Sequence, residues 1–191
     1  GKKESILTPD KANAVYLGGV MFPLKVTDPD YAALQVGNYL LGGAPLASRL
    51  SNRVRGEEGL SYGIGSMMAA DSRDAQARLM FFAITNPVNM TKVDAIIGEE
   101  INKFLKTGVS LAELNEGKAA FLQQQKLQRS NDNMVAMQLA TGLHVGRTFQ
   151  FHADLEEKIA ALKPEDIQAA FQKYLVPGKM VIIHAGDFKK K

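Results

Sequence analysis

The sequence predicts an α+β fold in which helices are layered on one face of a partly antiparallel sheet. Two apolar runs, residues 60–69 and 75–85, are joined by the polar turn Asp71-Ser-Arg-Asp74, which is the pattern of an antiparallel hairpin. The elements follow the order strand, helices, hairpin, several helices and a last strand. This order favours a layered α+β domain over a doubly wound parallel fold.

The first part of the chain is predicted to form a strand and two helices. Residues 14–22 are apolar throughout, as in a buried strand, and Pro23 ends the run. Asp28 and Pro29 suit the N-cap and the first position of a helix, which we expect to stop at Gly42-Gly43. A second, shorter helix is expected over residues 46–55.

Helices dominate the rest of the chain. After the hairpin, apolar residues recur every three or four positions (93, 97, 101 and 104) up to Gly108, which ends that helix. Ser110 and Glu113 have the spacing of a capping box, which opens a long helix toward Arg129. Further helices are expected over 133–145, over 151–162 and from Pro164 onward, before a turn at 176–178 and a final strand over 180–185.

Composition predicts one globular domain over residues 1–191. The chain is 46% hydrophobic and 23% charged, and its net charge of +3 is concentrated at the two ends. Elsewhere the basic residues are mixed with acidic ones, so no nucleic-acid surface is expected. No apolar run is long enough for a transmembrane helix. The start is neither a signal peptide nor an initiator Met, so we expect a piece of a longer chain.

Familiar catalytic motifs are absent from the sequence. The chain has no Cys, and H-x-x-E-H and its inverse do not occur. His152 and Glu156 are four residues apart in an expected helix, but His144 and His184 give no convincing third metal ligand. Ser66 lies outside any G-x-S-x-G elbow, and the glycines near it do not form a phosphate loop.

The residues 50–66 contain two side chains that are not obvious core residues, Arg55 and Tyr62. Arg55 could simply neutralise a helix C-terminus, and Tyr62 could be half-buried in a strand. Alternatively, the guanidinium and the phenol converge above the sheet and donate to a carbonyl oxygen or its oxyanion. Gly63 and Gly65 would give the strand a smooth face for close backbone packing, with Tyr62, Ile64 and Ser66 opposite.

The stretch Arg55-Gly-Glu-Glu-Gly-Leu-Ser-Tyr62 resembles the second-domain signature of the inverzincin zinc peptidases, the group of pitrilysin, insulysin and the mitochondrial processing peptidase. Asn38-Tyr-Leu-Leu-Gly-Gly-Ala-Pro-Leu-Ala-Ser-Arg-Leu50 resembles the family's preceding helix and glycine turn. Residues 162–175 and 181–188 resemble its late helix and closing strand. The resemblance covers nearly the whole chain and departs at Gly56, where relatives often have Glu.

This resemblance implies a processing-peptidase-like domain without the zinc motif. Zinc would be bound by another domain or subunit that bears H-x-x-E-H. Tyr62 would hydrogen-bond the scissile carbonyl or oxyanion of a peptide substrate, and Arg55 would hold the peptide backbone. Alone, the domain would be inactive. A non-catalytic scaffold or assembly subunit is the alternative, since some relatives are structural. Bacterial relatives are often periplasmic, which is the expected location, with cytoplasmic or mitochondrial alternatives.

Overall fold

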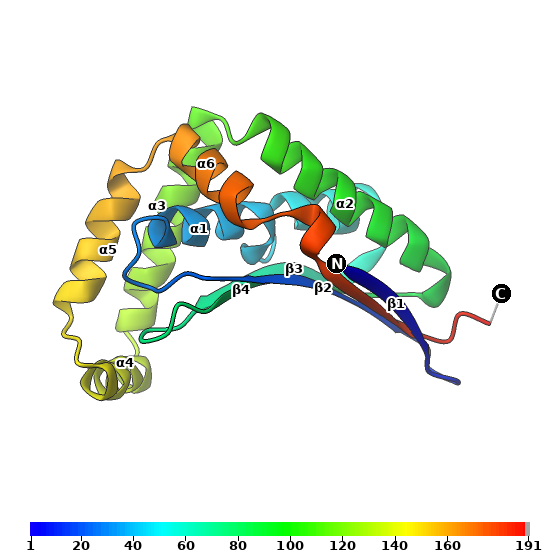
Figure 1. Cartoon of the computed structure of the whole chain (residues 1–191), viewed down its shortest axis with the longest axis horizontal. Coiled ribbons are helices and arrows are strands. Elements are labelled where there is room, and N and C mark those ends of the chain that lie inside the picture. Colours follow the sequence, from blue (N-terminus) through cyan, green and yellow to red (C-terminus); the bar gives the residue numbers. More distant parts are fainter. Residues whose placement is uncertain (190–191) are drawn as a thin grey trace.

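The structure, a computed structural model, describes residues 1–189 apart from the side chain of Tyr62. A five-stranded sheet has the order β1-β5-β2-β4-β3, and helices cover one of its faces (Figure 1). The strands are β1 (Lys2–Leu7), β2 (Ala14–Phe22), β3 (Ser61–Ala70), β4 (Ala77–Thr85) and β5 (Val181–Gly186). The predicted α+β fold is confirmed.

Strand pairing is mixed, as predicted. β3 and β4 form the expected antiparallel hairpin, and β2 pairs antiparallel with both β4 and β5. The edge strand β1 runs parallel to β5 and was not predicted from the sequence. Its side chains are all exposed, so it has no alternating apolar pattern to indicate a strand.

The helices follow the predicted order. The α-helices are α1 (Tyr31–Asn38), α2 (Met90–Thr107), α3 (Leu111–Arg129), α4 (Asp132–Val145), α5 (Gln150–Ala161) and α6 (Pro164–Tyr174). α1 continues into a π-helical stretch, η1 (Tyr39–Gly43), and a second π-helical stretch, η2 (Ser51–Glu57), precedes β3. Short 3₁₀ turns are η3 (Pro87–Asn89) and η4 (Pro177–Lys179). No described helix is long and apolar enough to cross a membrane.

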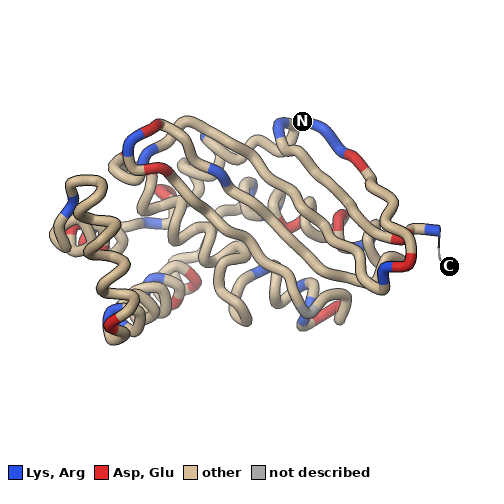
Figure 2. The backbone as a smooth tube through the Cα atoms, turned by 90° about the horizontal axis from the view of Figure 1, so that it is seen from below, with Lys and Arg blue, Asp and Glu red and all other residues tan. Residues whose placement is uncertain are grey.

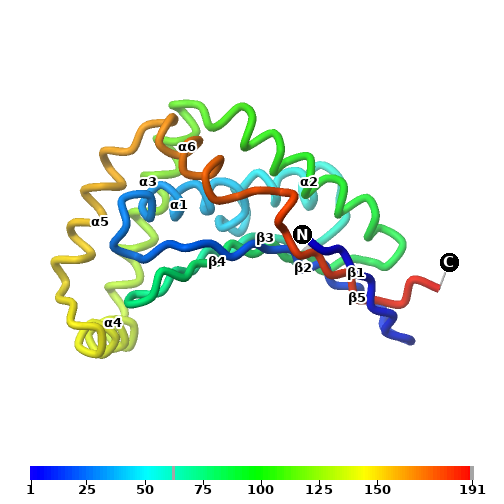
Figure 3. The backbone as a smooth tube through the Cα atoms, viewed as in Figure 1, coloured from blue at the N-terminus to red at the C-terminus, as the bar shows by residue number. Residues whose placement is uncertain are grey.

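The hydrophobic core lies between the sheet and the helix layer. On the sheet side, Tyr16 of β2 and Phe81 of β4 are buried in this core. Phe104 of α2 and Phe171 of α6 pack against each other, with ring centroids 4.8 Å apart. α4 and α5 lie beyond the hairpin end of the sheet (Figure 3), and none of the residues of α4 is buried.

Three local predictions were wrong in detail. Asp28 does not cap a helix, because its carboxylate accepts the N–H of Lys25 at 2.9 Å and α1 starts only at Tyr31. The second helix is helical from Arg49 rather than from residue 46. Ser110 Oγ does accept the N–H of Glu113 at 3.1 Å, but the Glu113 carboxylate pairs with Arg49 instead of closing the capping box.

Candidate functional site

The stretch that carries Arg55 is a tight passage from helix to strand. Arg55 lies in the last turn of η2, where a cation suits the helix dipole. The N–H of Leu60 donates to the carbonyl of Val54 at 2.9 Å and closes the end of the helix. Gly59 has φ +61°, a left-handed conformation that favours glycine. The turn is therefore set by backbone geometry.

A β-bulge follows immediately and includes Tyr62. Ser61 pairs with Thr85 and Gly63 with Ile84, so Tyr62 is the extra residue of the bulge. Ser61 Oγ donates to the carbonyl of Ile84 at 2.6 Å and accepts the N–H of Gly63 at 3.2 Å. Thr85 Oγ1 donates to the carbonyl of Leu60 at 2.6 Å. Two hydroxyls thus hold the backbone on either side of Tyr62, whose side chain lies outside the described residues.

The acidic residues of this stretch form ion pairs with cations other than Arg55. Arg53 Nη1 lies 2.8 Å from Glu57 and 3.2 Å from Glu58, and Lys92 Nζ lies 2.7 Å from Glu58. The hydrogen bond from Lys92 is the main cause of the lowered pKa of Glu58. Arg55 is exposed, and its side chain has no ion pair or hydrogen bond with any described side chain. The guanidinium is therefore available to a ligand.

The predicted close packing at the strand glycines is confirmed for Gly65 and not for Gly63. A Cβ on Gly65 would lie 3.0 Å from the carbonyl oxygen of Gly42, whereas one on Gly63 would meet only the side chain of Ile84 at 3.6 Å. On the opposite face, Ile64 and Ser66 are buried. Ser66 Oγ donates to Asn38 Oδ1 at 2.7 Å, a structural bond that links β3 to α1.

The three histidines lie on different elements, His144 on α4, His152 on α5 and His184 on β5. His184 is buried, with Nε2 3.4 Å from Asp94 and its ring 5.5 Å from that of Tyr16. His144 is exposed, and its carbonyl accepts a hydrogen bond from Arg73. Glu156, the suggested partner of His152, forms an ion pair with Arg129 at 2.6 Å. Over residues 1–189 no group of three or more His, Cys, Asp or Glu could hold a metal, so these residues do not fit a zinc centre.

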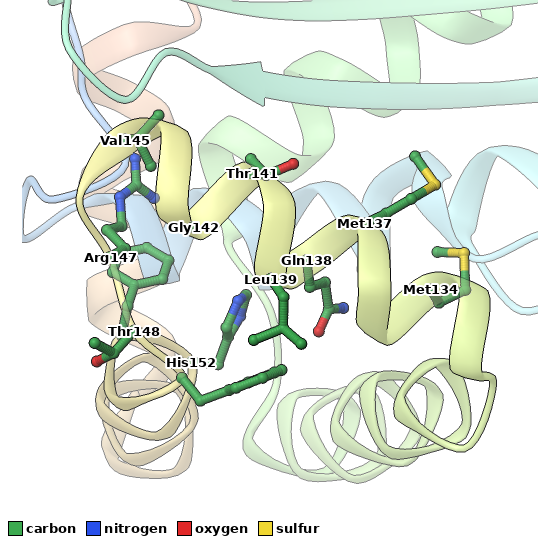
Figure 4. Close-up of a pocket in the computed structure, with 12 residues that line it drawn as sticks. Met134, Met137, Gln138, Leu139, Thr141, Gly142, Val145, Arg147, Thr148 and His152 are labelled. Atoms are coloured by element: carbon green, nitrogen blue, oxygen red, sulfur yellow. The ribbon is translucent and has the colours of Figure 1, made fainter.

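A separate pocket of about 280 Å³ lies between α4 and α5 (Figure 4). Its walls are mainly apolar and include Met134, Met137 and Leu139. The Arg147 guanidinium lies over the ring of Phe151, 4.5 Å from its centroid. Burial, followed by the charges of Arg129 and Arg147, lowers the pKa of His152 at its edge. The pocket could accept an apolar side chain, and the sequence patterns did not predict it.

The chain is similar to known proteins both in sequence and in fold. Residues 1–121 match the family model described as the Peptidase M16 inactive domain. The chain is 25% identical over 168 residues to the non-peptidase homolog YmxG of Helicobacter pylori, which is 87% of this chain and 38% of that protein. The chain therefore spans well under half of this curated relative.

Solved structures agree with this match. The peptidase M16 inactive domain from Pseudomonas fluorescens has a TM-score of 0.83 and 25% identity, over 97% of this chain and 43% of that chain. The periplasmic protease PqqL from Escherichia coli shares the fold, with a TM-score of 0.73 and 17% identity, over 95% of this chain and 20% of that one. Together with the match over residues 1–121, these similarities establish that the chain belongs to the family of the Peptidase M16 inactive domain.

Proposed function

We propose that this chain is the substrate-clamping, non-zinc-binding domain of a zinc metalloendopeptidase. The observation that supports this most is the exposed Arg55 side chain, which has no ion pair with the acidic residues beside it. Its neighbouring carboxylates are held by Arg53 and Lys92, and Arg55 itself is exposed without a described partner. A scaffold role in which the signature packs internally would instead place Arg55 among partners of its own domain.

In this proposal the two signature side chains hold a peptide. The Arg55 guanidinium is a planar set of donors that binds backbone carbonyls of the substrate. The Tyr62 hydroxyl donates to the scissile carbonyl and more strongly to the oxyanion that develops from it. The bulge fixed by Ser61 and Thr85 would orient Tyr62. The zinc ion and the carboxylate base belong to a companion domain or subunit with H-x-x-E-H.

The test requires the assembled enzyme. We expect Arg55→Ala to raise KM for a peptide substrate, because a ground-state contact to the backbone is lost. Lys103→Ala, at an exposed cation of α2 outside this stretch, is the control and should leave KM unchanged. Equal KM values for the Arg55→Ala and unchanged enzymes would refute the clamping role of Arg55.

A second candidate function is a non-catalytic scaffold or assembly subunit. The observation in its favour is the relative named as a non-peptidase homolog. The two functions are separated by reading the native gene beyond residue 1 and its neighbours for H-x-x-E-H, and by the kinetic test above. We place the enzyme in the bacterial periplasm, a location supported by the similarity to periplasmic PqqL.

A further inference from the structure

The pocket between α4 and α5 combines one cation with a mainly apolar wall. Among the side chains that line it, only Arg147 has a permanent charge, and none is an Asp or Glu. Methionine, leucine, valine and phenylalanine side chains make up most of the wall. Figure 4 shows Gln138 and Leu139 of α4 pointing toward His152 of α5. Arg147 lies on the segment that joins the two helices.

Arg147 has no carboxylate partner. Its Nη2 atom is buried without a hydrogen-bond partner, and its side chain forms no ion pair with any described residue. The guanidinium carbon lies 4.5 Å from the centroid of the Phe151 ring. Withdrawing a charged group from water costs free energy unless an acceptor replaces the lost hydrogen bonds. This position therefore favours a ligand that brings an acceptor.

The acidic residues of α5 do not neutralise Arg147. Glu156 forms an ion pair with Arg129 at 2.6 Å. Asp154 accepts a hydrogen bond from a glutamine of the same helix at 2.8 Å. Glu157 is exposed, and none of the three acidic residues lines the pocket. The missing carboxylate is therefore one that a bound molecule can supply.

Gln138 is a second polar group of the pocket without a partner. Its Oε1 atom is buried and accepts no hydrogen bond from the described residues. A half-turn of the carboxamide presents its NH₂ group at the same place, and this group donates to a carboxylate. Because Gln138 and Arg147 line the same pocket, one ligand with a polar end can satisfy both.

The apolar wall indicates the rest of the ligand. Met137 is 64% and Leu139 is 53% exposed, and none of the residues of α4 is buried. Asp132 is the one Asp, Glu, Lys or Arg of α4, so this helix, at the left of Figure 2, is tan beyond its start. Covering such a wall removes apolar surface from water, which is favourable. The volume of about 280 Å³ suits a short chain or a single ring.

We propose that this pocket binds a small apolar carboxylate, with the carboxylate on the Arg147 guanidinium and the carbon chain against Met137 and Leu139. Two sources offer this chemistry, a free short-chain acid and the C-terminal apolar residue of a peptide. The planar guanidinium presents parallel donors that match a carboxylate. The inference does not depend on the proposed peptidase function, because no residue of the stretch 50–66 lines the pocket.

Isothermal titration of the native protein that contains this chain tests the proposal with matched probes. The probes are octanoate, octanamide, N-acetyl-L-leucine and N-acetyl-L-leucinamide. We expect the acids to bind about tenfold or more tightly than their amides, because only the acids form a charge-assisted hydrogen bond. Tighter binding of octanoate identifies a free acid as the source, and tighter binding of N-acetyl-L-leucine identifies a peptide C-terminus. Equal affinities of acid and amide contradict the role of the carboxylate.

Matched variants locate the binding in this pocket. Arg147→Gln should weaken octanoate binding about tenfold or more and leave octanamide binding unchanged. Arg78→Gln, the same change at an exposed arginine of β4, should affect neither probe. Leu139→Asp should also weaken octanoate binding, because it places a competing carboxylate in the pocket. Leu111→Asp is its control, at a leucine of α3 that is 62% exposed.

Three results overturn the proposal. Failure of both acids to bind at millimolar concentration shows that the pocket does not take such a ligand. Octanoate affinity that is unchanged in both Arg147→Gln and Leu139→Asp, with circular dichroism showing that the variants fold, places the binding elsewhere. Tighter binding of octyl phosphate than of octanoate assigns Arg147 to a phosphate ester instead of a carboxylate.

Discussion

Arg53 Nη1 lies 2.8 Å from Glu57 Oε2, one turn further along η2. This ion pair distinguishes Arg53 from Arg55, which lies only two residues further along the chain. Arg53 also reaches Glu58 at 3.2 Å, so it holds the charged turn before β3. Arg55 lacks any such partner among the described side chains. Arg53 therefore has a structural role, and Arg55 is the residue available to a ligand.

The two arginines should differ in their effect on stability. Arg53→Ala should lower the free energy of unfolding slightly, because an ion pair that is largely screened by solvent is lost, and Arg55→Ala should lower it less. Urea denaturation of both variants measures this. A larger loss for Arg55→Ala would mean that Arg55 has a structural partner.

Arg49 should be far more important for stability than Arg53 or Arg55. Its guanidinium binds both carboxylate oxygens of Glu113 at 2.7 Å, donates to the carbonyl of Gly108 at 2.8 Å and lies over the ring of Phe104. Only 18% of the Arg49 side chain and 28% of the Glu113 side chain is exposed. We expect Arg49→Ala to cost about 2–4 kcal/mol, because a partly buried carboxylate loses its partner.

Urea denaturation of Arg49→Ala, Glu113→Gln and the double variant measures the coupling. The double variant should be more stable than the sum of the two single losses predicts. Strictly additive losses would show that the two side chains do not interact.

Two glycines should respond oppositely to alanine. A Cβ on Gly42 would lie 2.5 Å from Ser66 Oγ and 2.8 Å from the Ser66 backbone nitrogen, so η1 and β3 must separate. Gly42→Ala should therefore cost about 1–3 kcal/mol. Gly98, within α2, has nothing within 4 Å of its Cβ position, and Gly98→Ala should stabilise by about 0.5–1 kcal/mol.

Thermal or urea unfolding of the two alanine variants distinguishes these effects. If Gly42→Ala matched the unchanged chain in stability, the close approach of η1 to β3 would be contradicted.

His152 should make stability depend on pH. Burial is the main cause that lowers its pKa below the ordinary value of 6.5, and Arg129 and Arg147 lower it further. As pH falls through 6.5, the unfolded chain takes up the proton first. The protein therefore loses stability over that interval, and the loss stops growing below the folded pKa. His152→Gln should reduce this loss, as measured by urea denaturation between about pH 7.5 and pH 5.

NMR titration of the His152 ring provides the direct measurement. A titration midpoint above 6.5 in the folded protein would contradict the assigned environment. An unchanged pH dependence of stability in His152→Gln would contradict the linkage.

The fold was largely predictable because its elements are marked locally. Gly108, with φ +63°, ends α2, and Pro164 starts α6, so a single residue type fixes each boundary. β1 was missed because Lys2 to Leu7 is exposed and polar at its start, and only pairing with β5 makes it a strand. Asp28 was misread because its carboxylate can bind the N–H of Lys25 as well as a helix N-terminus.

The candidate site was only partly predictable. Arg55 and Tyr62 were found as side chains that are not obvious core residues, and family resemblance supplied the roles predicted for them. The pairing of Arg53 with Glu57 could have been found from their spacing of four residues, which favours an ion pair on a helix. The bulge at Tyr62 depends on hydroxyl bonds from Ser61 and Thr85, and such long-range contacts are not visible in the sequence.

The most direct measurement is the turnover of the assembled enzyme with Tyr62→Phe. The account predicts a fall in kcat on the order of 10²-fold with little change in KM, because one donor to the oxyanion is lost while the ring remains. Tyr39→Phe, whose ring packs on Phe121 in the helix layer, is the matched control and should keep full turnover. An unchanged kcat for Tyr62→Phe would contradict the proposal that this chain contributes half of a peptidase site.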